Sequence, residues 1–316
     1  MTVAPITKRE EELNIEWIKW GKITWVNVEK PTTKDIDYLA KNYLFHPLDL
    51  EDCLSRIELP KIDEYENYLF SVLHFPVFHK KARVTIPSQV SVFIGADFVV
   101  TVHSGDLKPL VKLFKDCQQN ERAREDNMAR SSGYLLYRIL DRLVDYCFPI
   151  MNKIIANVEA AEERLFSEQA RDTVREISVL RRDIMAYRRI IRHQPAILKS
   201  LEEKDYPFLR EDLDVYYGDI GDHVGKLMET LEEYKEIVEG LFDTGDSLSS
   251  HRTSEVMKML TILGTILLPL LLVASLYGMN VSLPFEDSSL AFTFIILISF
   301  AISGGMLAYF RLKRWI

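Results

Sequence analysis

The stretch that decides the fold is MKMLTILGTILLPLLLVASLYGMN, residues 257–280. Lys258 is its only charged residue, and the next charge along the chain is Glu286. A second uncharged run covers residues 288–310. Each run is long enough to cross about 30 Å of hydrocarbon as a helix. The sequence therefore predicts two transmembrane helices, at 257–280 and 289–310.

The charges that flank these runs predict their orientation. Arg252 and Lys258 precede or begin the first run, whereas the connecting segment 281–288 contains no Lys or Arg. The basic residues after the second run lie in the tail 311–316: Arg311, Lys313 and Arg314. Positive charges favour the cytoplasmic side, so we expect a multi-pass protein of the inner (plasma) membrane with both termini in the cytoplasm. The segment 281–288 is then an outer loop, and its acids are Glu286 and Asp287.

The rest of the chain has the composition of a soluble, acidic protein. The 316 residues include 39 Lys and Arg against 47 Asp and Glu, and only six of these charges lie beyond residue 256. This balance argues against nucleic acid as a partner. Three widely separated cysteines indicate neither a disulfide framework nor a zinc site. Residues 1–19 have no apolar core of signal-peptide length, so we expect membrane insertion through the C-terminal end.

Residues 1–130 predict a mixed α/β domain. The strand patterns cover 22–28, 68–75 and 89–102. The last is interrupted by Gly95-Ala96-Asp97, which predicts a hairpin. Thr32, followed three residues later by Asp35, resembles a capping box at the start of a helix. A further helix is expected at 107–119.

Residues 131–256 predict a helical stalk, because apolar residues recur there every three or four positions. No proline occurs between Pro207 and Pro269. One helix of about 70 residues, roughly 100 Å long, is therefore expected to run from the stalk through the first span. Pro269 should kink this helix locally, which transmembrane helices tolerate.

Two charged faces occur in the stalk. The basic face comprises Arg181, Arg182, Arg188, Arg189 and Arg192, and the acidic face comprises Glu229, Glu232, Glu233, Glu236, Glu239 and Asp243. The first interpretation is that these are paired, solvated helix faces. The alternative is that they handle cations near a conduit.

The search for catalytic chemistry finds no phosphate-binding loop, no metalloprotease motif and seven scattered histidines. The sequence therefore predicts neither an enzyme nor an organic cofactor. Neither span carries a deep charge, so an ion path would have to use carbonyl, hydroxyl or amide oxygens. Asn280, next to Gly278 at the outer end of the first span, is the candidate.

Tyr277-Gly278-Met279-Asn280, placed at the end of the first of two C-terminal spans, resembles the Gly-Met-Asn signature of CorA-type magnesium channels. The stretches EVMKMLT (255–261), LLPL (267–270) and PKIDEYENY (60–68) are also similar to that family. The resemblance spans most of the chain. It implies a homopentameric funnel in which the first span lines a pore, the second forms an outer ring, and the stalk helices form the cytoplasmic part.

The resemblance also implies a function, namely channel-like uptake of divalent cations. The transported ion would chiefly be Mg²⁺, with Co²⁺ and Ni²⁺ as companions, and the membrane potential would drive entry. Gly278, Met279 and Asn280 would form the selectivity filter, which contacts Mg²⁺ through its tightly held water shell. Glu286 and Asp287 would concentrate cations outside.

Steps of three and four residues back from the filter define a face of the first span that we call the pore face. It comprises Ser275, Leu271, Leu268, Gly264, Leu260, Met257 and Ser254. Its large apolar members could form a constriction that gates by dewetting. The alternative is that these residues only pack against neighbouring helices.

Gating in the family responds to cytoplasmic Mg²⁺, and the matched segments assign Glu66, Asp219 and Asp222 as its ligands between subunits. The sequence departs from the family pattern at Asn67, at Leu271 and in the outer loop, which bears on ion preference. Two alternatives stay open. One is a zinc transporter of the related branch, and the other is a non-conducting two-pass scaffold or sensor.

Overall fold

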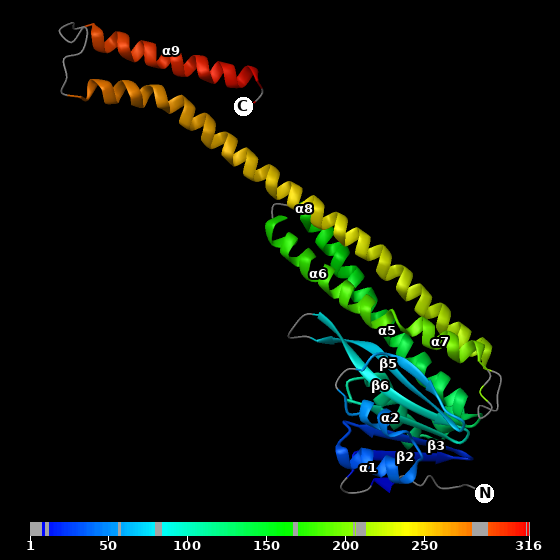
Figure 1. Cartoon of the computed structure of the whole chain (residues 1–316). Helices are drawn as coiled ribbons and strands as arrows, with labels where there is room; N and C mark the ends of the chain where they lie inside the picture. The colour runs from blue at the N-terminus through cyan, green and yellow to red at the C-terminus, as the bar shows by residue number, and fades with distance from the viewer. Residues whose placement is uncertain are drawn as a thin grey trace. The chain divides into compact units, whose positions relative to one another are not determined.

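The computed structural model describes residues 8–9, 13–55, 58–79, 84–166, 170–204, 206, 213–279, 290–313 and 315. The chain divides into two compact units (Figure 1). We call residues 1–242 the sheet unit and residues 243–316 the span unit. The helices that follow residue 131 thus lie in the same unit as the sheet, as far as residue 242.

The sheet unit is built on a mixed β-sheet with the strand order β1-β2-β3-β7-β6-β5-β4. Only β3 and β7 pair in parallel, and the other neighbours are antiparallel. The strands are β1 (Lys8–Arg9), β2 (Ile15–Trp20), β3 (Ile23–Glu29), β4 (Lys61–Glu64), β5 (Tyr68–His79), β6 (Val84–Gly95) and β7 (Phe98–His103). The predicted α/β character of this region is confirmed.

Gly95 lies at the turn of the hairpin that β6 and β7 form. Ile94 of β6 pairs with Val99 of β7. A Cβ atom on Gly95 would lie 2.4 Å from the ring of Phe98, far inside van der Waals contact. A side chain at this position would therefore have to displace the Phe98 ring. The hairpin predicted at residues 95–97 is confirmed.

One face of the sheet is covered by two short helices, α1 (Thr33–Asn42) and α2 (Pro47–Asp52). The carboxylate of Asp35 accepts hydrogen bonds from the backbone N–H (2.8 Å) and the hydroxyl (2.7 Å) of Thr32, which fixes the start of α1 as predicted. An aromatic core fills this layer. The Phe93 ring lies 4.0 Å from that of Phe45 and 4.5 Å from that of Phe70, measured between centroids.

The opposite face is covered by four helices: α3 (Lys108–Gln119), α4 (Glu121–Met128), α5 (Ser132–Leu165) and α6 (Ala170–Ile191). Trp25 of β3 meets Phe114 of α3 edge to face, with ring centroids 5.0 Å apart. The indole N–H of Trp25 donates to the hydroxyl of Thr101, 3.1 Å away. α6 is held on the sheet by Asp183, whose carboxylate accepts the backbone N–H of Thr85.

After α7 (Gln194–Glu203), the helix α8 (Asp214–Tyr277) runs for 64 residues. It continues through Pro269, so the single long helix predicted from the sequence is confirmed. Within the sheet unit it pairs with α6 through charged side chains. Arg188 Nε lies 2.6 Å from Glu232 Oε2, and an oxygen of Glu239 lies 3.5 Å from Arg181. These contacts support the interpretation of paired helix faces.

The span unit contains the part of α8 that follows residue 242, together with the whole of α9 (Ala291–Leu312). The hydroxyl of Ser303 on α9 donates to the backbone carbonyl of Ile266 on α8, 3.0 Å away. Both helices are long and apolar enough to cross a membrane. The two predicted spans therefore correspond to two helices of the structure.

Candidate ion pathway and regulatory site

The pore face lies on one continuous helix, because Ser254 to Ser275 all belong to α8. Side chains three and four residues apart share a side of a helix, so the predicted positions do form one face. Its four large apolar side chains, Met257, Leu260, Leu268 and Leu271, are 59–64% exposed. Within the described part of the chain, nothing covers them. This face must therefore meet lipid or other copies of the chain.

The end of α8 carries the first residues of the predicted filter. The backbone N–H of Gly278 donates to the carbonyl of Ala274 (3.0 Å), and that of Met279 to the carbonyl of Leu276 (3.3 Å). A Cβ atom on Gly278 would lie 3.1 Å from the Ala274 carbonyl oxygen. The glycine thus permits this tight end of the helix. Asn280, Glu286 and Asp287 lie outside the described residues.

The predicted regulatory acids are exposed and lie on separate elements. Glu66 is in the turn between β4 and β5, whereas Asp219 and Asp222 project from α8. Asp219 lies 4.0 Å from the imidazole of His223, and its charge also helps to raise the pKa values of Asp141 and Tyr137 on α5. Among the described residues, no group of three or more His, Cys, Asp or Glu side chains could hold a metal ion. One chain alone does not bring the three acids together.

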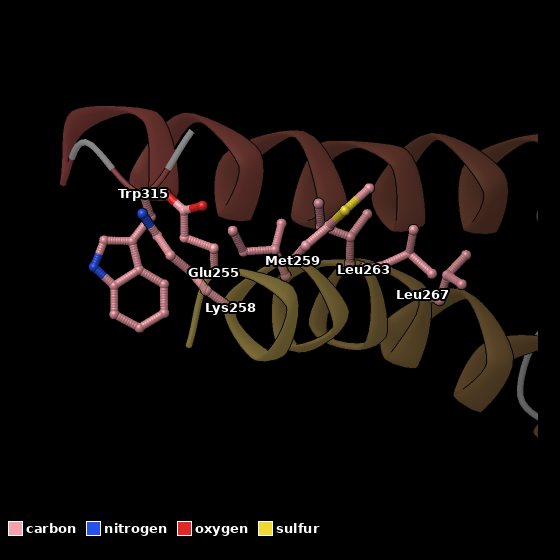
Figure 2. A pocket seen from close by; sticks show the side chains of 8 residues that line it. Glu255, Lys258, Met259, Leu263, Leu267 and Trp315 are labelled. Atoms are coloured by element: carbon pink, nitrogen blue, oxygen red, sulfur yellow. The ribbon is translucent and has the colours of Figure 1, made fainter. Parts of the chain in front are cut away.

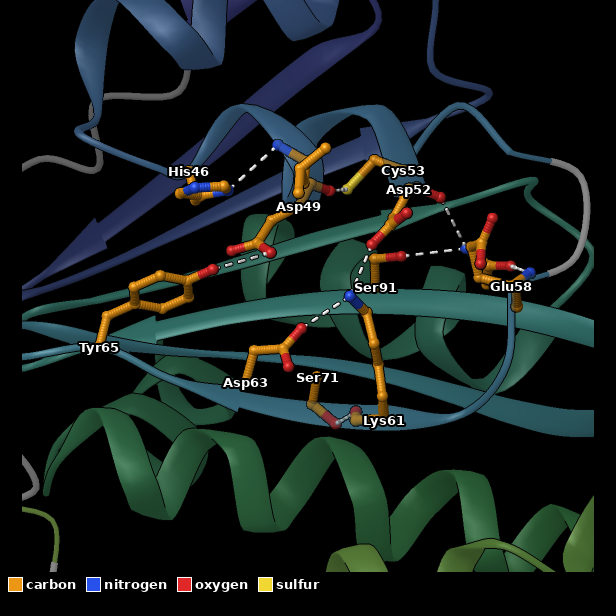
Figure 3. Close-up of polar contacts among 12 residues, drawn as sticks. His46, Asp49, Asp52, Cys53, Glu58, Lys61, Asp63, Tyr65, Ser71 and Ser91 are labelled. Atoms are coloured by element: carbon orange, nitrogen blue, oxygen red, sulfur yellow. Dashed lines mark hydrogen bonds and ion pairs between the residues drawn. The ribbon is translucent and has the colours of Figure 1, made fainter.

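The turn that carries Glu66 is braced by a polar network beneath α2 (Figure 3). The hydroxyls of Tyr65 and Tyr68 donate to the two carboxylate oxygens of Asp49, at 3.1 and 3.2 Å. The backbone N–H of Tyr65 donates to the carbonyl of Tyr68, 3.0 Å away, and closes the turn. Burial raises the pKa of the Asp49 carboxyl, and the two tyrosine hydroxyls oppose that rise.

Lys61 extends this network along β4. Its ammonium lies 2.8 Å from a carboxylate oxygen of Asp52 and 2.7 Å from one of Asp63 (Figure 3). Burial disfavours the charge on Lys61, but the hydrogen bonds to the two acids prevail and raise its pKa. Lys61 therefore stays positive and neutralises acids close to the turn.

Sequence reasoning identified part of this network only as a stretch similar to the CorA family. That stretch, residues 60–68, contains Lys61, Tyr65 and Tyr68. Asp49 was missed because it lies on α2, outside the stretch. No sequence signal distinguishes Asp49 from the other acids of PLDLED, because its burial depends on how α2 packs on the sheet. In the structure, its buried carboxylate needs the hydrogen-bonding partners that the tyrosines supply.

The three cysteines are buried and form no disulfide in the structure. Burial raises the pKa of each thiol, at Cys53, Cys117 and Cys147, to about 12. In this structure they are therefore neutral, buried side chains.

These features define a class of protein: a membrane protein in which a sheet-based unit connects, through one long helix, to two apolar spans. The model of the CorA-like Mg²⁺ transporter family matches residues 20–314, and the chain belongs to that family. It is therefore a member of a family of divalent cation transporters and not an enzyme.

Individual relatives agree over nearly the full chain. The cobalt/magnesium transport protein CorA of Thermotoga maritima is 30% identical over 300 residues, which cover 93% of this chain and 83% of the relative. The CorA of Methanocaldococcus jannaschii is 23% identical over 301 residues, covering 93% and 92%. The solved structure of the latter transporter superposes with a TM-score of 0.80 at 22% identity and covers 100% of both chains. The fold predicted from the sequence is thereby confirmed at full length.

Proposed function

We propose that this chain forms a homopentameric channel that takes up hydrated Mg²⁺, and also Co²⁺ and Ni²⁺. The observation that carries the proposal is the exposed pore face, which follows α8 up to Gly278 and Met279. Two helices per chain cannot enclose a conduit, so several copies must contribute one helix each. Family membership and the resemblance of the Gly-Met-Asn stretch favour five copies.

Selection takes place at the outer end of α8 in this proposal. Mg²⁺ releases its waters reluctantly, so a ring of neutral oxygens can hold the ion with its hydration shell intact. Asn280 supplies an amide oxygen, and Gly278 supplies a carbonyl to which a second chain can approach closely. Below the filter, Leu271, Leu268, Leu260 and Met257 form an apolar constriction.

The driving force is the membrane potential. Moving one charge through 100 mV is worth about 2.3 kcal/mol, and a divalent ion gains about twice as much. In the proposed orientation, both termini lie in the cytoplasm and the chain spans the inner (plasma) membrane. Glu286 and Asp287 then face outward and raise the local concentration of cations.

Regulation uses cytoplasmic Mg²⁺, bound by Glu66 of one chain and by Asp219 and Asp222 of its neighbour. The exposure of all three acids leaves them accessible to a second copy. The network of Asp49, Tyr65 and Tyr68 holds the Glu66 turn in place. Millimolar Mg²⁺ should therefore protect the chain from proteolysis, and neutralising all three acids should remove this protection. Protection that persists in the triple variant would contradict the assignment.

The test of the function is Asn280→Ala in proteoliposomes that contain a Mg²⁺ indicator. We expect the variant to lose selective Mg²⁺ entry, because the filter loses its ring of amide oxygens. Asn152→Ala, at an exposed position of α5, is the matched control and should conduct normally. Selective Mg²⁺ entry that is unchanged in Asn280→Ala would contradict the filter assignment. Zn²⁺ entry that follows a pH gradient would contradict the proposed ion and favour the zinc branch.

A further inference from the structure

A groove of about 610 Å³ runs along α8 in the span unit, and Trp315, which follows α9, lies at one end of it (Figure 2). Its apolar wall is formed by Met259, Ile262, Leu263 and Leu267 of α8. Met259, Leu263 and Leu267 are 68%, 53% and 43% exposed, so the groove is open in the described chain. Figure 2 shows these side chains in a row along α8.

One end of the groove is polar and is formed by Lys258, Glu255 and Trp315. The indole of Trp315 stacks on the ring of Phe310 (5.6 Å between centroids), and the backbone N–H of Trp315 donates to the Phe310 carbonyl (2.9 Å). The ammonium of Lys258 lies 5.9 Å from the centre of the indole. Lys258 forms no ion pair with another described residue, whereas Glu255 lies 3.8 Å from His251.

The groove lies on the side of α8 opposite the pore face. Steps of four from Lys258 lead to Ile262 and Ile266, and helical geometry places this line about half a turn away from Leu260 and Leu268. An occupant of the groove therefore does not enter the conduit. This step depends on the proposed pore face.

The length and polarity of the groove match one lipid molecule. From Lys258 to Leu267, the helix rises about 14 Å, which is half of the roughly 30 Å of hydrocarbon in a bilayer. The charged end lies at the end of the second span, because Lys258 is 5.9 Å from the ring of Trp315, and the sequence just before Trp315 contains Arg311 and Lys313. Tryptophan and lysine are the side chains that mark the boundary between acyl chains and headgroups.

From these observations, we propose that the groove binds an anionic phospholipid of the leaflet on the Lys258 side. One acyl chain lies along Met259, Leu263 and Leu267, and the phosphate contacts the ammonium of Lys258. Trp315 closes the headgroup end and contacts the first carbons of the chain. Charge complementarity favours an anionic headgroup, because Lys258 has no ion-pair partner among the described residues, whereas Glu255 at the same end already lies 3.8 Å from the imidazole of His251.

The test uses the full-length protein in phosphatidylcholine vesicles to which a brominated lipid is added, either phosphatidylglycerol or phosphatidylcholine. Bromine quenches tryptophan on contact, and Trp315 is the only tryptophan beyond residue 25. The signal of Trp315 is obtained by subtracting that of Trp315→Phe. We expect brominated phosphatidylglycerol to quench Trp315 several-fold more strongly than brominated phosphatidylcholine.

Three variants identify the headgroup contact. Lys258→Gln should abolish the preference for phosphatidylglycerol, and Lys258→Arg should keep it. Lys226→Gln, which removes a charge from α8 in the sheet unit, should also keep it. Equal quenching by both lipids, or a preference that survives Lys258→Gln, would overturn the proposal. Absence of quenching together with disulfide cross-linking of Leu263→Cys between chains would show instead that another subunit fills the groove. None of these readouts depends on ion flux, so failure here is separable from failure of the channel proposal.

Discussion

The sheet unit and the span unit differ in where their apolar side chains lie. In the sheet unit, Trp25, Phe93 and Tyr187 are fully buried. In the described part of the span unit, the only buried hydrophobic residues are Ile262 and Phe310, each 9% exposed. The sheet unit therefore contains its own core. The span unit is more hydrophobic but has almost no core, so it requires hydrocarbon or other copies of the chain.

This difference means that the same substitution should have opposite consequences in the two units. Removing a large apolar side chain from the sheet unit leaves a cavity and lowers stability. Removing a large apolar side chain from the pore face should leave the packing within the chain nearly unchanged. It should instead alter the contacts of this face with lipid or with other copies of the chain. Each of the following predictions tests one part of this contrast.

The largest effect is expected for Phe93→Ala, because this ring packs between Phe45 and Phe70. We expect the free energy of unfolding of the sheet unit to fall by about 3–5 kcal/mol. Denaturant unfolding of the full chain in detergent, followed by tryptophan fluorescence, measures it. The matched change Leu268→Ala should alter this free energy by less than about 0.5 kcal/mol. A comparable loss in Leu268→Ala would show that the pore face packs within the chain.

A second effect of similar size concerns acid sensitivity. Burial lowers the pKa of His103 to about 4. Its Nδ1 accepts the N–H of Gly105 (3.0 Å), so the neutral ring donates from Nε2 to the side-chain oxygen of Asn27, also 3.0 Å away. The unfolded chain takes up a proton near pH 6.5 and the folded chain only near pH 4. The contribution of His103 to the free energy of unfolding should therefore be fully present above pH 6.5. It should be lost, by on the order of 3 kcal/mol, as the pH drops to 4.

The variant His103→Asn isolates this contribution. His74 is also buried, and burial lowers its pKa too, so the variant should reduce the acid-dependent loss without removing it. The control is His251→Gln on α8 in the span unit, where the side chain is 75% exposed. We expect this control to leave the pH dependence of unfolding unchanged. An unaltered pH dependence in His103→Asn would show that His103 does not cause the acid-dependent loss of stability.

The smallest effect is expected for the contact between the two spans. Ser303→Ala removes the hydrogen bond to the carbonyl of Ile266. Such bonds between membrane helices contribute about 0.6 kcal/mol on average, so the thermal midpoint, followed by Trp315 fluorescence, should fall only slightly. In Ser299→Ala, the lost bond is to Ile295 of α9 itself, and the midpoint should not change. Equal shifts in both variants would mean that Ser303 does not join the helices.

The sequence predicted those helices, spans and turns that are determined by residues close together in the chain. The two spans follow from uncharged length, the long helix from the absence of proline over residues 208–268, and the hairpin from the Gly95-Ala96-Asp97 turn signal. β2 was not predicted, because IEWIKW is short and its identity as a strand depends on pairing with β3. Its register, Trp17 with Val26 for example, is a tertiary property.

In the candidate site, too, the sequence predicted the residues of a local motif but not the contacts between separate elements. Gly278 and Met279 lie at the end of α8, where the motif predicted them, because the motif and the helix end are one stretch of chain. The brace of Asp49, Tyr65 and Tyr68 joins two elements, and no sequence period links them. The assembly of Glu66 with Asp219 and Asp222 requires a second chain, so it remains a prediction.

The most direct test of the channel proposal is ion flux into proteoliposomes with the interior held negative. The account predicts Mg²⁺ entry that grows with the potential and is blocked by hexaamminecobalt, a mimic of the hydrated ion. Native mass measurement of the same sample should give five copies. A sample of intact pentamers that admits no divalent cation at any potential, with Mg²⁺ removed from the inside, would contradict the account and favour a non-conducting scaffold.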